Sequence, residues 1–198
     1  MNSSKSRNEG VSKMIQTIDL KKGMVFKRGE KLLRVLQINH HKPGKGNTLM
    51  QMDIQDIRSG SIVHTTMRPS EKVEQVDVDK RNAQYLYDEG DSSVFMDLEN
   101  YNQYSLAHSQ ITEERKYLVE NMNVTLEFVN GDIVGIELPA TVTMEVTETQ
   151  PEIKGATIDG GGKPATTNTG LVVNVPAFIK NGDKIIVNTA DGAYKSRA

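Results

Sequence analysis

The chain has 198 residues, 36% of them hydrophobic, and a net charge of −2, which is a composition typical of a globular protein with a packed core. It has no cysteine, which excludes disulfide scaffolds and thiolate zinc sites and agrees with a reducing compartment. No apolar run reaches the roughly 20 residues that cross a bilayer, and the polar N-terminus lacks a signal-peptide core, so we expect a cytoplasmic protein without membrane contact.

Charge is distributed unevenly along the chain. Residues 14–76 hold 11 Lys and Arg against 6 Asp and Glu, whereas residues 77–140 hold 4 against 13. Residues 141–198 are balanced at 6 against 6. A basic segment joined to an acidic one suggests that the first faces a polyanion such as nucleic acid, although charge also varies between domains by chance.

Residues 1–13 precede the first regular pattern, and we expect a disordered extension there. Beyond them, short β-rich runs alternate with turn signals such as Asn130-Gly131, a pattern typical of small barrels and sandwiches. The runs are Lys31–Ile38, Thr48–Ile54, Asn123–Phe128, Ile133–Leu138, Leu171–Val175 and Lys184–Asn188. The sequence therefore predicts an all-β protein of three small domains, at residues 14–78, 79–140 and 141–198.

The segment from His40 to Thr48 lies between two predicted strands. Pro43, Gly44 and Gly46 indicate a tight turn, and Lys45 stands between the glycines with no neighbouring side chain to shield it. Such a turn would carry its lysine away from the body as a mobile cation, although an ordinary solvated hairpin has the same pattern. The adjacent His40 and His41 point to opposite faces of a strand, which argues against a shared metal ion.

One segment reads as a short helix. Thr112 can cap it, Glu113 and Glu114 suit the positive end of its macrodipole, and Tyr117, Leu118 and Met122 would share one face. We expect this helix to close the side of a barrel.

Catalytic signatures are lacking. Gly160–Thr166 has a superficial likeness to a phosphate-binding loop, but Pro164 follows Lys163 where that loop needs Ser or Thr. Its backbone amides could still contact an RNA phosphate. The carboxylate pairs Asp88-Glu89 and Glu113-Glu114 stand in solvated, acidic surroundings, so the sequence predicts no enzyme.

Two stretches give the chain a resemblance to a known family. The first is Lys42-Pro43-Gly44-Lys45-Gly46. The second runs from Thr149 to Arg197 and includes Lys154-Gly155-Ala156-Thr157, Gly161-Gly162-Lys163-Pro164-Ala165-Thr166 and Val175-Pro176-Ala177-Phe178-Ile179. Over residues 14–198 the chain resembles bacterial elongation factor P.

The resemblance implies three β-barrel domains in an L shape that mimics tRNA, an SH3/KOW-like domain followed by two OB-folds. It implies a monomer that binds the 70S ribosome between the P and E sites and relieves stalling at consecutive prolines. Lys45 would reach the peptidyl-transferase centre beside the P-site peptidyl-tRNA, supported by Pro43, Gly44, Gly46 and Asn47. No cofactor is implied, apart from a modification of Lys45 by a lysine-modifying enzyme, which the sequence leaves open.

The resemblance also implies contacts with tRNA and ribosomal RNA. We expect them from Lys42, from the loop Gly155-Ala156-Thr157 near the E-site codon, and from Tyr194 and Arg197. Tyr194 could instead belong to the core and Arg197 be merely solvated. Many family members have Asp where this chain has Ala156, so that contact is either weaker here or made by the backbone.

Two alternatives stay open from the sequence. One is the elongation factor P-like paralogue, which shares the fold and the ribosome. The other is a generic OB-fold protein that binds single-stranded RNA, although its stacking platforms would need aromatic residues, which make up only 5% of this chain.

Overall fold

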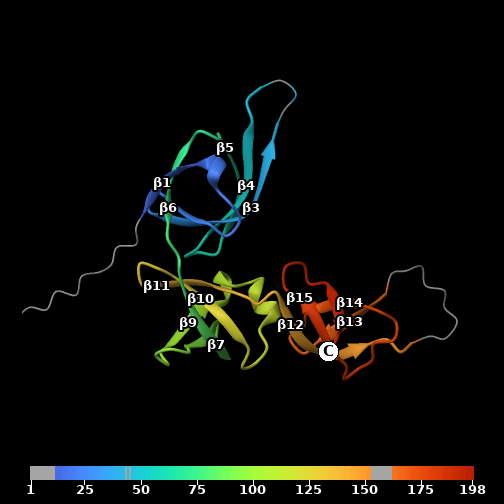
Figure 1. Cartoon of the computed structure of the whole chain (residues 1–198). Coiled ribbons are helices and arrows are strands. Elements are labelled where there is room, and N and C mark those ends of the chain that lie inside the picture. The colour runs from blue at the N-terminus through green and yellow to red at the C-terminus, as the bar shows by residue number, and fades with distance from the viewer. Residues whose placement is uncertain (1–11, 43, 45, 153–161) are drawn as a thin grey trace, which may run out of the picture. The chain divides into compact units, whose positions relative to one another are not determined.

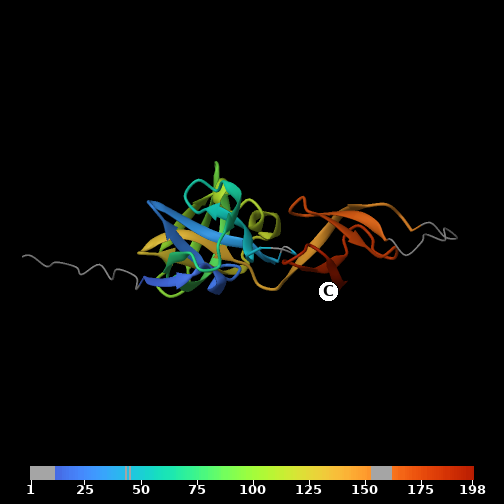
Figure 2. The same cartoon turned by 90° about the horizontal axis from the view of Figure 1, so that it is seen from above.

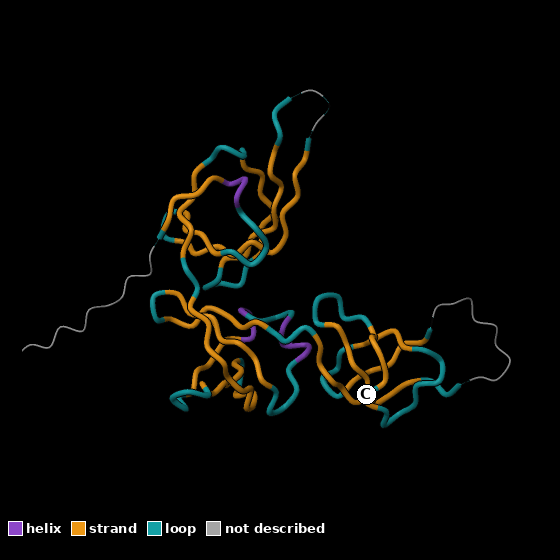
Figure 3. The backbone as a smooth tube through the Cα atoms, in the orientation of Figure 1, coloured by secondary structure: helices purple, strands orange, loops and turns teal. Residues whose placement is uncertain are grey.

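The computed structural model describes residues 12–42, 44, 46–152 and 162–198 (Figure 1). Sixteen strands and three short 3₁₀ turns account for the regular structure of these residues, and none of them forms an α-helix. Figure 3 shows strand as the main element throughout. The predicted all-β class is therefore confirmed. None of the described helical turns is long or apolar enough to span a membrane.

The first sheet has six strands in the order β1-β6-β2-β3-β4-β5. The strands are β1 (Lys13–Gln16), β2 (Val25–Arg28), β3 (Lys31–His41), β4 (Leu49–Asp56), β5 (Ile62–Met67) and β6 (Lys72–Val76). Alternate side chains of β4, namely Met50, Met52 and Ile54, point into its core. They meet Phe26 and Val35, both fully buried, and the short turn η1 (Thr17–Asp19) follows β1.

The second sheet has the order β11-β10-β7-β8-β9. Its strands are β7 (Asp79–Glu89), β8 (Ser92–Asp97), β9 (Gln103–Ala107), β10 (Asn123–Val129) and β11 (Asp132–Glu137). Asn130 and Gly131 join the last two with φ values of 51° and 83°. Positive φ at both central residues is the mark of a type I′ hairpin, as the Asn-Gly pair predicts.

The third sheet, orange to red in Figure 2, has the order β14-β13-β12-β15-β16. Its strands are β12 (Thr141–Thr149), β13 (Lys163–Thr167), β14 (Val172–Val175), β15 (Lys184–Asn188) and β16 (Tyr194–Arg197). Its core is built mainly from valine, isoleucine and methionine side chains, including Met144, Val146, Ile179 and Ile185. These residues suit the half-buried faces of a pleated sheet.

The predicted helix after Thr112 is wrong in kind. Two 3₁₀ turns occupy the region, η2 (His108–Gln110) and η3 (Glu114–Tyr117), and the chain is already extended at Leu118. The Thr112 hydroxyl donates backwards to the carbonyl of His108 at 3.2 Å and so caps no helix. The side chain of Tyr117 is nevertheless buried, in the core of the third sheet.

The described residues gather into two compact units. One holds those up to Arg81 together with Leu126–Gly135, and the other holds Asn82–Thr125 together with Ile136–Ala198. This division follows spatial contacts rather than chain order. The domain limits 14–78, 79–140 and 141–198 stay predictions.

Candidate functional site

Strands β3 and β4 form a long antiparallel pair within the first sheet, here called the β3–β4 ribbon (Figure 1). Their antiparallel pairing runs from Leu33 opposite Asp56 to His41 opposite Leu49. The neighbouring strand β5 accompanies β4 only as far as Met50 opposite Met67. The last rung of the ribbon therefore has no third strand beside it, and the ribbon leads to the segment that contains Lys45.

Described residues at the end of this ribbon are exposed: Lys42, Gly44, Gly46 and Asn47. A Cβ added to Gly44 would meet no atom within 4 Å. Gly46 has φ 130°, a value that L residues with side chains rarely adopt, so glycine suits this position. Pro43 and Lys45 lie outside the described residues, and their roles stay predictions.

The histidines before the turn are both exposed on β3. Within the described part of the chain, no group of three or more His, Asp or Glu side chains is arranged to hold a metal ion.

The predicted loop Gly155-Ala156-Thr157 lies outside the described residues, but both of its flanks are visible. Lys163 is buried, and its ammonium donates to the carbonyl of Gln150 across the base of the loop. The Thr149 hydroxyl donates to the Pro164 carbonyl at 2.9 Å. Strand β13 then begins at Lys163, where a phosphate-binding loop would continue into a helix. Lys163 therefore has a structural role, because its hydrogen bond joins the two flanks of the loop. The sequence motif did not indicate this role.

Tyr194 and Arg197 are the first and last residues of β16. Tyr194 is partly buried and packs against the core of the third sheet. The guanidinium of Arg197 lies 3.0 Å from the carboxylate of Asp183, and its side chain is 58% exposed. The side chain of Tyr194 is thus partly buried in the core, and that of Arg197 is held at the surface by its ion pair with Asp183. Their contact with RNA stays a prediction.

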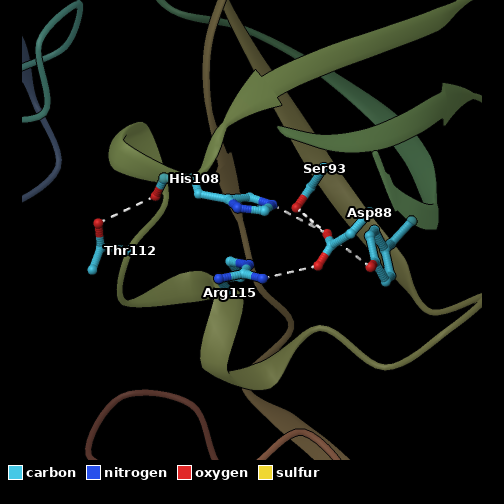
Figure 4. Close-up of polar contacts among 6 residues, drawn as sticks. Asp88, Ser93, His108, Thr112 and Arg115 are labelled. Atoms are coloured by element: carbon cyan, nitrogen blue, oxygen red, sulfur yellow. Dashed lines mark hydrogen bonds and ion pairs between the residues drawn. The ribbon is translucent and has the colours of Figure 1, made fainter. Parts of the chain in front are cut away.

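A polar cluster that the sequence did not reveal surrounds Asp88 (Figure 4). One carboxylate oxygen accepts hydrogen bonds from the Ser93 hydroxyl at 2.6 Å and the Tyr85 hydroxyl at 3.0 Å. The other accepts from Arg115 at 3.1 Å. His108 Nε2 lies 3.4 Å from the first oxygen, at ion-pair distance but without hydrogen-bond geometry. Asp88 is thus an anchored acceptor rather than the solvated carboxylate that its neighbours in sequence suggest.

The cluster shifts two pKa values in opposite directions. Burial works to raise the pKa of the Asp88 carboxyl, but hydrogen bonds from Ser93, Arg115 and Tyr85 outweigh it and hold the pKa below its ordinary 3.8. Burial, followed by the hydrogen bond to Asp88 and its charge, raises the pKa of Tyr85 to about 12. At neutral pH these shifts keep Asp88 ionised and Tyr85 protonated, as the hydrogen bond between them requires.

Serine, histidine and aspartate together call for comparison with a nucleophilic triad. In such a triad the histidine stands between serine and aspartate and takes the serine's proton. Here the Ser93 hydroxyl donates directly to Asp88, and His108 faces the same carboxylate oxygen. Ser93 is also fully buried. The arrangement therefore activates no nucleophile, and it joins β7 and β8 to the turns η2 and η3.

Comparison with known proteins gives a consistent picture. Three family models match successive parts of the chain: the elongation factor P KOW-like domain at residues 16–73, the elongation factor P OB domain at 78–136, and the elongation factor P C-terminal domain at 142–197. Together they cover most of the sequence and support the KOW-like and OB assignments.

Named relatives agree with the family models. Elongation factor P of Limosilactobacillus reuteri (strain DSM 20016) is 80% identical over 93% of this chain and 100% of its own length. That of Enterococcus faecalis (strain ATCC 700802 / V583) is 52% identical over the same shares. A solved structure titled eukaryotic translation initiation factor 5A from Methanococcus jannaschii, at 25% identity, covers 63% of this chain and 94% of its own with a TM-score of 0.45. The chain belongs to the elongation factor P family of translation elongation factors.

Proposed function

We propose that this factor binds the ribosome between the P and E sites and stimulates peptide-bond formation at consecutive prolines, by positioning the P-site peptidyl-tRNA through Lys45. Family membership supports the proposal. The observation that carries it is the β3–β4 ribbon, whose pairing continues to His41 and Leu49, directly beside the turn that contains Lys45. A paired ribbon can present a side chain at a distance from the body of the protein.

The proposed mechanism requires no chemical step by the factor itself. Proline is a secondary amine with a fixed ring, so it is a poor nucleophile and a poorly oriented one. A factor that holds peptidyl-tRNA in a productive geometry lowers the entropic cost of the reaction. A cation on a long, thin stem can contact the RNA backbone without displacing the substrates. Ribosomal RNA then supplies the remaining catalysis.

The charge of the first segment suits this partner. Residues 14–76 carry an excess of five positive charges, and Lys42 is exposed next to the turn. We assign to this segment the main contact with the acceptor arm of the tRNA, and to residues 155–157, Tyr194 and Arg197 a contact with tRNA or small-subunit RNA. The proposed partners are the 70S ribosome, P-site peptidyl-tRNA and ribosomal RNA, and we propose that the factor binds them as a monomer.

The deciding experiment replaces the lysine at the turn. We expect Lys45→Ala to remain folded, because exposed substitutions usually change stability by less than about 0.5 kcal/mol, yet to lose relief of stalling. The measurement is translation of a reporter with three consecutive prolines in a reconstituted system. Lys184→Ala, which removes an exposed lysine from β15 outside the segments assigned to RNA, is the matched control and should be fully active. Full activity of Lys45→Ala would refute the assignment.

A further inference from the structure

Arg34 and Glu127 form a buried ion pair within one compact unit. Arg34 lies on β3 and Glu127 on β10, and their side chains are only 13% and 8% exposed. Nη2 of the guanidinium lies 2.5 Å from Oε2 of the carboxylate, although the N–H bonds of this nitrogen are not directed well enough at that oxygen for a hydrogen bond. The guanidinium and the carboxylate are therefore both largely removed from water, and each is the oppositely charged partner of the other.

The surroundings of the pair are built to hold it. A Cβ on Gly135 of β11 would lie 3.0 Å from the same guanidinium nitrogen, so glycine lets the arginine approach the strand closely. An apolar cluster in the same unit joins Val25 and Val76 of the first sheet, and Ile57 just after β4, to Val129 of β10 and Val134 of β11.

The pair lies close to the start of the ribbon. Arg34 is the fourth residue of β3, and the strand continues to His41. Because β3 has a bulge between Val35 and Gln37, this stretch pairs with only six steps of β4, from Gln55 to Leu49, and at about 3.3 Å per residue the distance is about 20 Å. A rotation of about 5° at Arg34 would move the far end by about 2 Å, and misplacement by about 1 Å can cost a hundredfold in rate. The direction of β3 at Arg34 therefore contributes to where the turn lies.

We infer that the Arg34–Glu127 ion pair is a positioning device, which fixes the direction of the β3–β4 ribbon against β10 and β11 and so sets where its turn is presented. The functional part of this inference rests on the proposed role of Lys45. Apolar contacts hold two surfaces together but permit sliding, because the hydrophobic effect has no direction. A buried ion pair penalises sliding, since separation leaves two charges without partners in a medium of low dielectric constant.

The test compares two variants in which the ion pairs of β3 are changed. Removing one partner of the buried pair alone would leave an unpaired buried charge, so the informative variant is Arg34→Met with Glu127→Leu, because apolar replacements of a buried pair often preserve stability. The control is Lys31→Met, also on β3, which breaks the ion pair between Lys31, whose side chain is 71% exposed, and Asp56 of β4.

The first measurement is a distance distribution between two spin labels. The chain has no cysteine, so His41→Cys on the ribbon and Asp132→Cys on β11, both exposed, can be labelled specifically. We expect a broader or displaced distribution for the double variant and an unchanged one for Lys31→Met. If the double variant does not fold, Gly135→Ala, which crowds the guanidinium, must displace the distribution instead. An unchanged distribution in a folded variant overturns the inference.

The second measurement separates positioning from binding. Formation of proline–proline bonds is followed on reconstituted ribosomes at increasing factor concentration. A positioning residue lowers the maximal rate, here by about tenfold, and leaves the half-saturating concentration nearly unchanged, whereas a merely structural role would leave both unchanged at equal folded concentration. A displaced ribbon with an unchanged maximal rate overturns the positioning role. Full activity of Lys45→Ala would refute the proposed function alone, since the label distances do not depend on it.

Discussion

Gly162 illustrates how one residue can be determined by the backbone around it. Its φ is +64°, and an added Cβ would lie 2.6 Å from the carbonyl oxygen of Val175. Gly170, in the same compact unit, has φ +84° but open space around the corresponding position. Comparing substitutions at the two glycines therefore distinguishes the cost of backbone strain, which both share, from that of a steric clash, which only Gly162 has.

We expect Gly162→Ala to destabilise the folded state clearly more than Gly170→Ala. Backbone strain of about 1–3 kcal/mol applies to both residues, and the clash adds to it only at Gly162. Denaturant unfolding of both variants measures the difference in the free energy of unfolding. Equal losses would show that the third sheet relaxes around the extra methyl group.

Tyr85 and Asp88 lead to a prediction about alkaline pH. The folded-state pKa of Tyr85 is raised to about 12 from 10.0, so its contribution to stability is fully present below pH 10 and is lost as pH rises toward 12. Asp88→Asn removes the negative charge and should lower the pKa of Tyr85. The absorbance of tyrosinate during an alkaline titration measures this pKa.

Tyr85→Phe identifies the transition of Tyr85 among the six tyrosines. An unchanged transition in Asp88→Asn would mean that burial alone causes the shift. At acid pH the sign is reversed for Asp88, because its lowered pKa stabilises the fold above 3.8 and this stability is lost as pH falls further.

Arg197 carries the third prediction at the residue scale. If it contacts RNA, Arg197→Ala should weaken ribosome binding by about 1–3 kcal/mol, the value of a charge-assisted hydrogen bond. Its ion pair with Asp183 is partly exposed, and such pairs contribute about 0–1 kcal/mol, so the melting temperature should barely change. Chemical footprinting and affinity measurement decide it, with the exposed neighbour Lys195→Ala as control. An unchanged footprint and affinity would confine Arg197 to the ion pair.

At the scale of elements, alternation of apolar residues predicted the strands well where one face is buried. The runs Asn123–Phe128 and Lys184–Asn188 correspond closely to β10 and β15. The run from Lys31 was expected to end at Ile38, but β3 continues to His41. The additional residues are polar and exposed on both faces, so only their pairing with β4 reveals them as strand.

Other features depend on contacts between distant residues, and local patterns could not predict them. One hydrogen bond of the Asp88 cluster joins residues 27 positions apart, and the Arg34–Glu127 pair joins different sheets. The helix predicted after Thr112 failed for a related reason. Tyr117 and Met122 both pack on the core of the third sheet, but they do so from a 3₁₀ turn and the extended chain after it, so a continuous helical face is not needed.

At the scale of the whole molecule, the uneven charge predicts how binding depends on salt. Affinity for the ribosome–tRNA complex should fall as salt rises, because contacts with phosphate release counterions. Lys42→Glu should weaken binding and reduce this dependence. Glu113→Lys, which reverses an exposed charge in the acidic segment, should leave binding nearly unchanged. Filter binding at several salt concentrations measures both, and equal effects would refute the assignment of RNA contact to residues 14–76.

The number of paired residues in β3 and β4 also determines how far the turn lies from the first sheet. A strand advances about 3.3 Å per residue, and its side chains alternate between faces. Removing one residue from each strand would shorten the ribbon and move the side chains near the turn to the opposite face. Removing two residues from each strand would shorten it by about 6.6 Å and leave those side chains on their present face. The distance from the first sheet to the turn can therefore change only by whole residues. If the turn must lie at one fixed position, only a few lengths of the β3–β4 ribbon are possible.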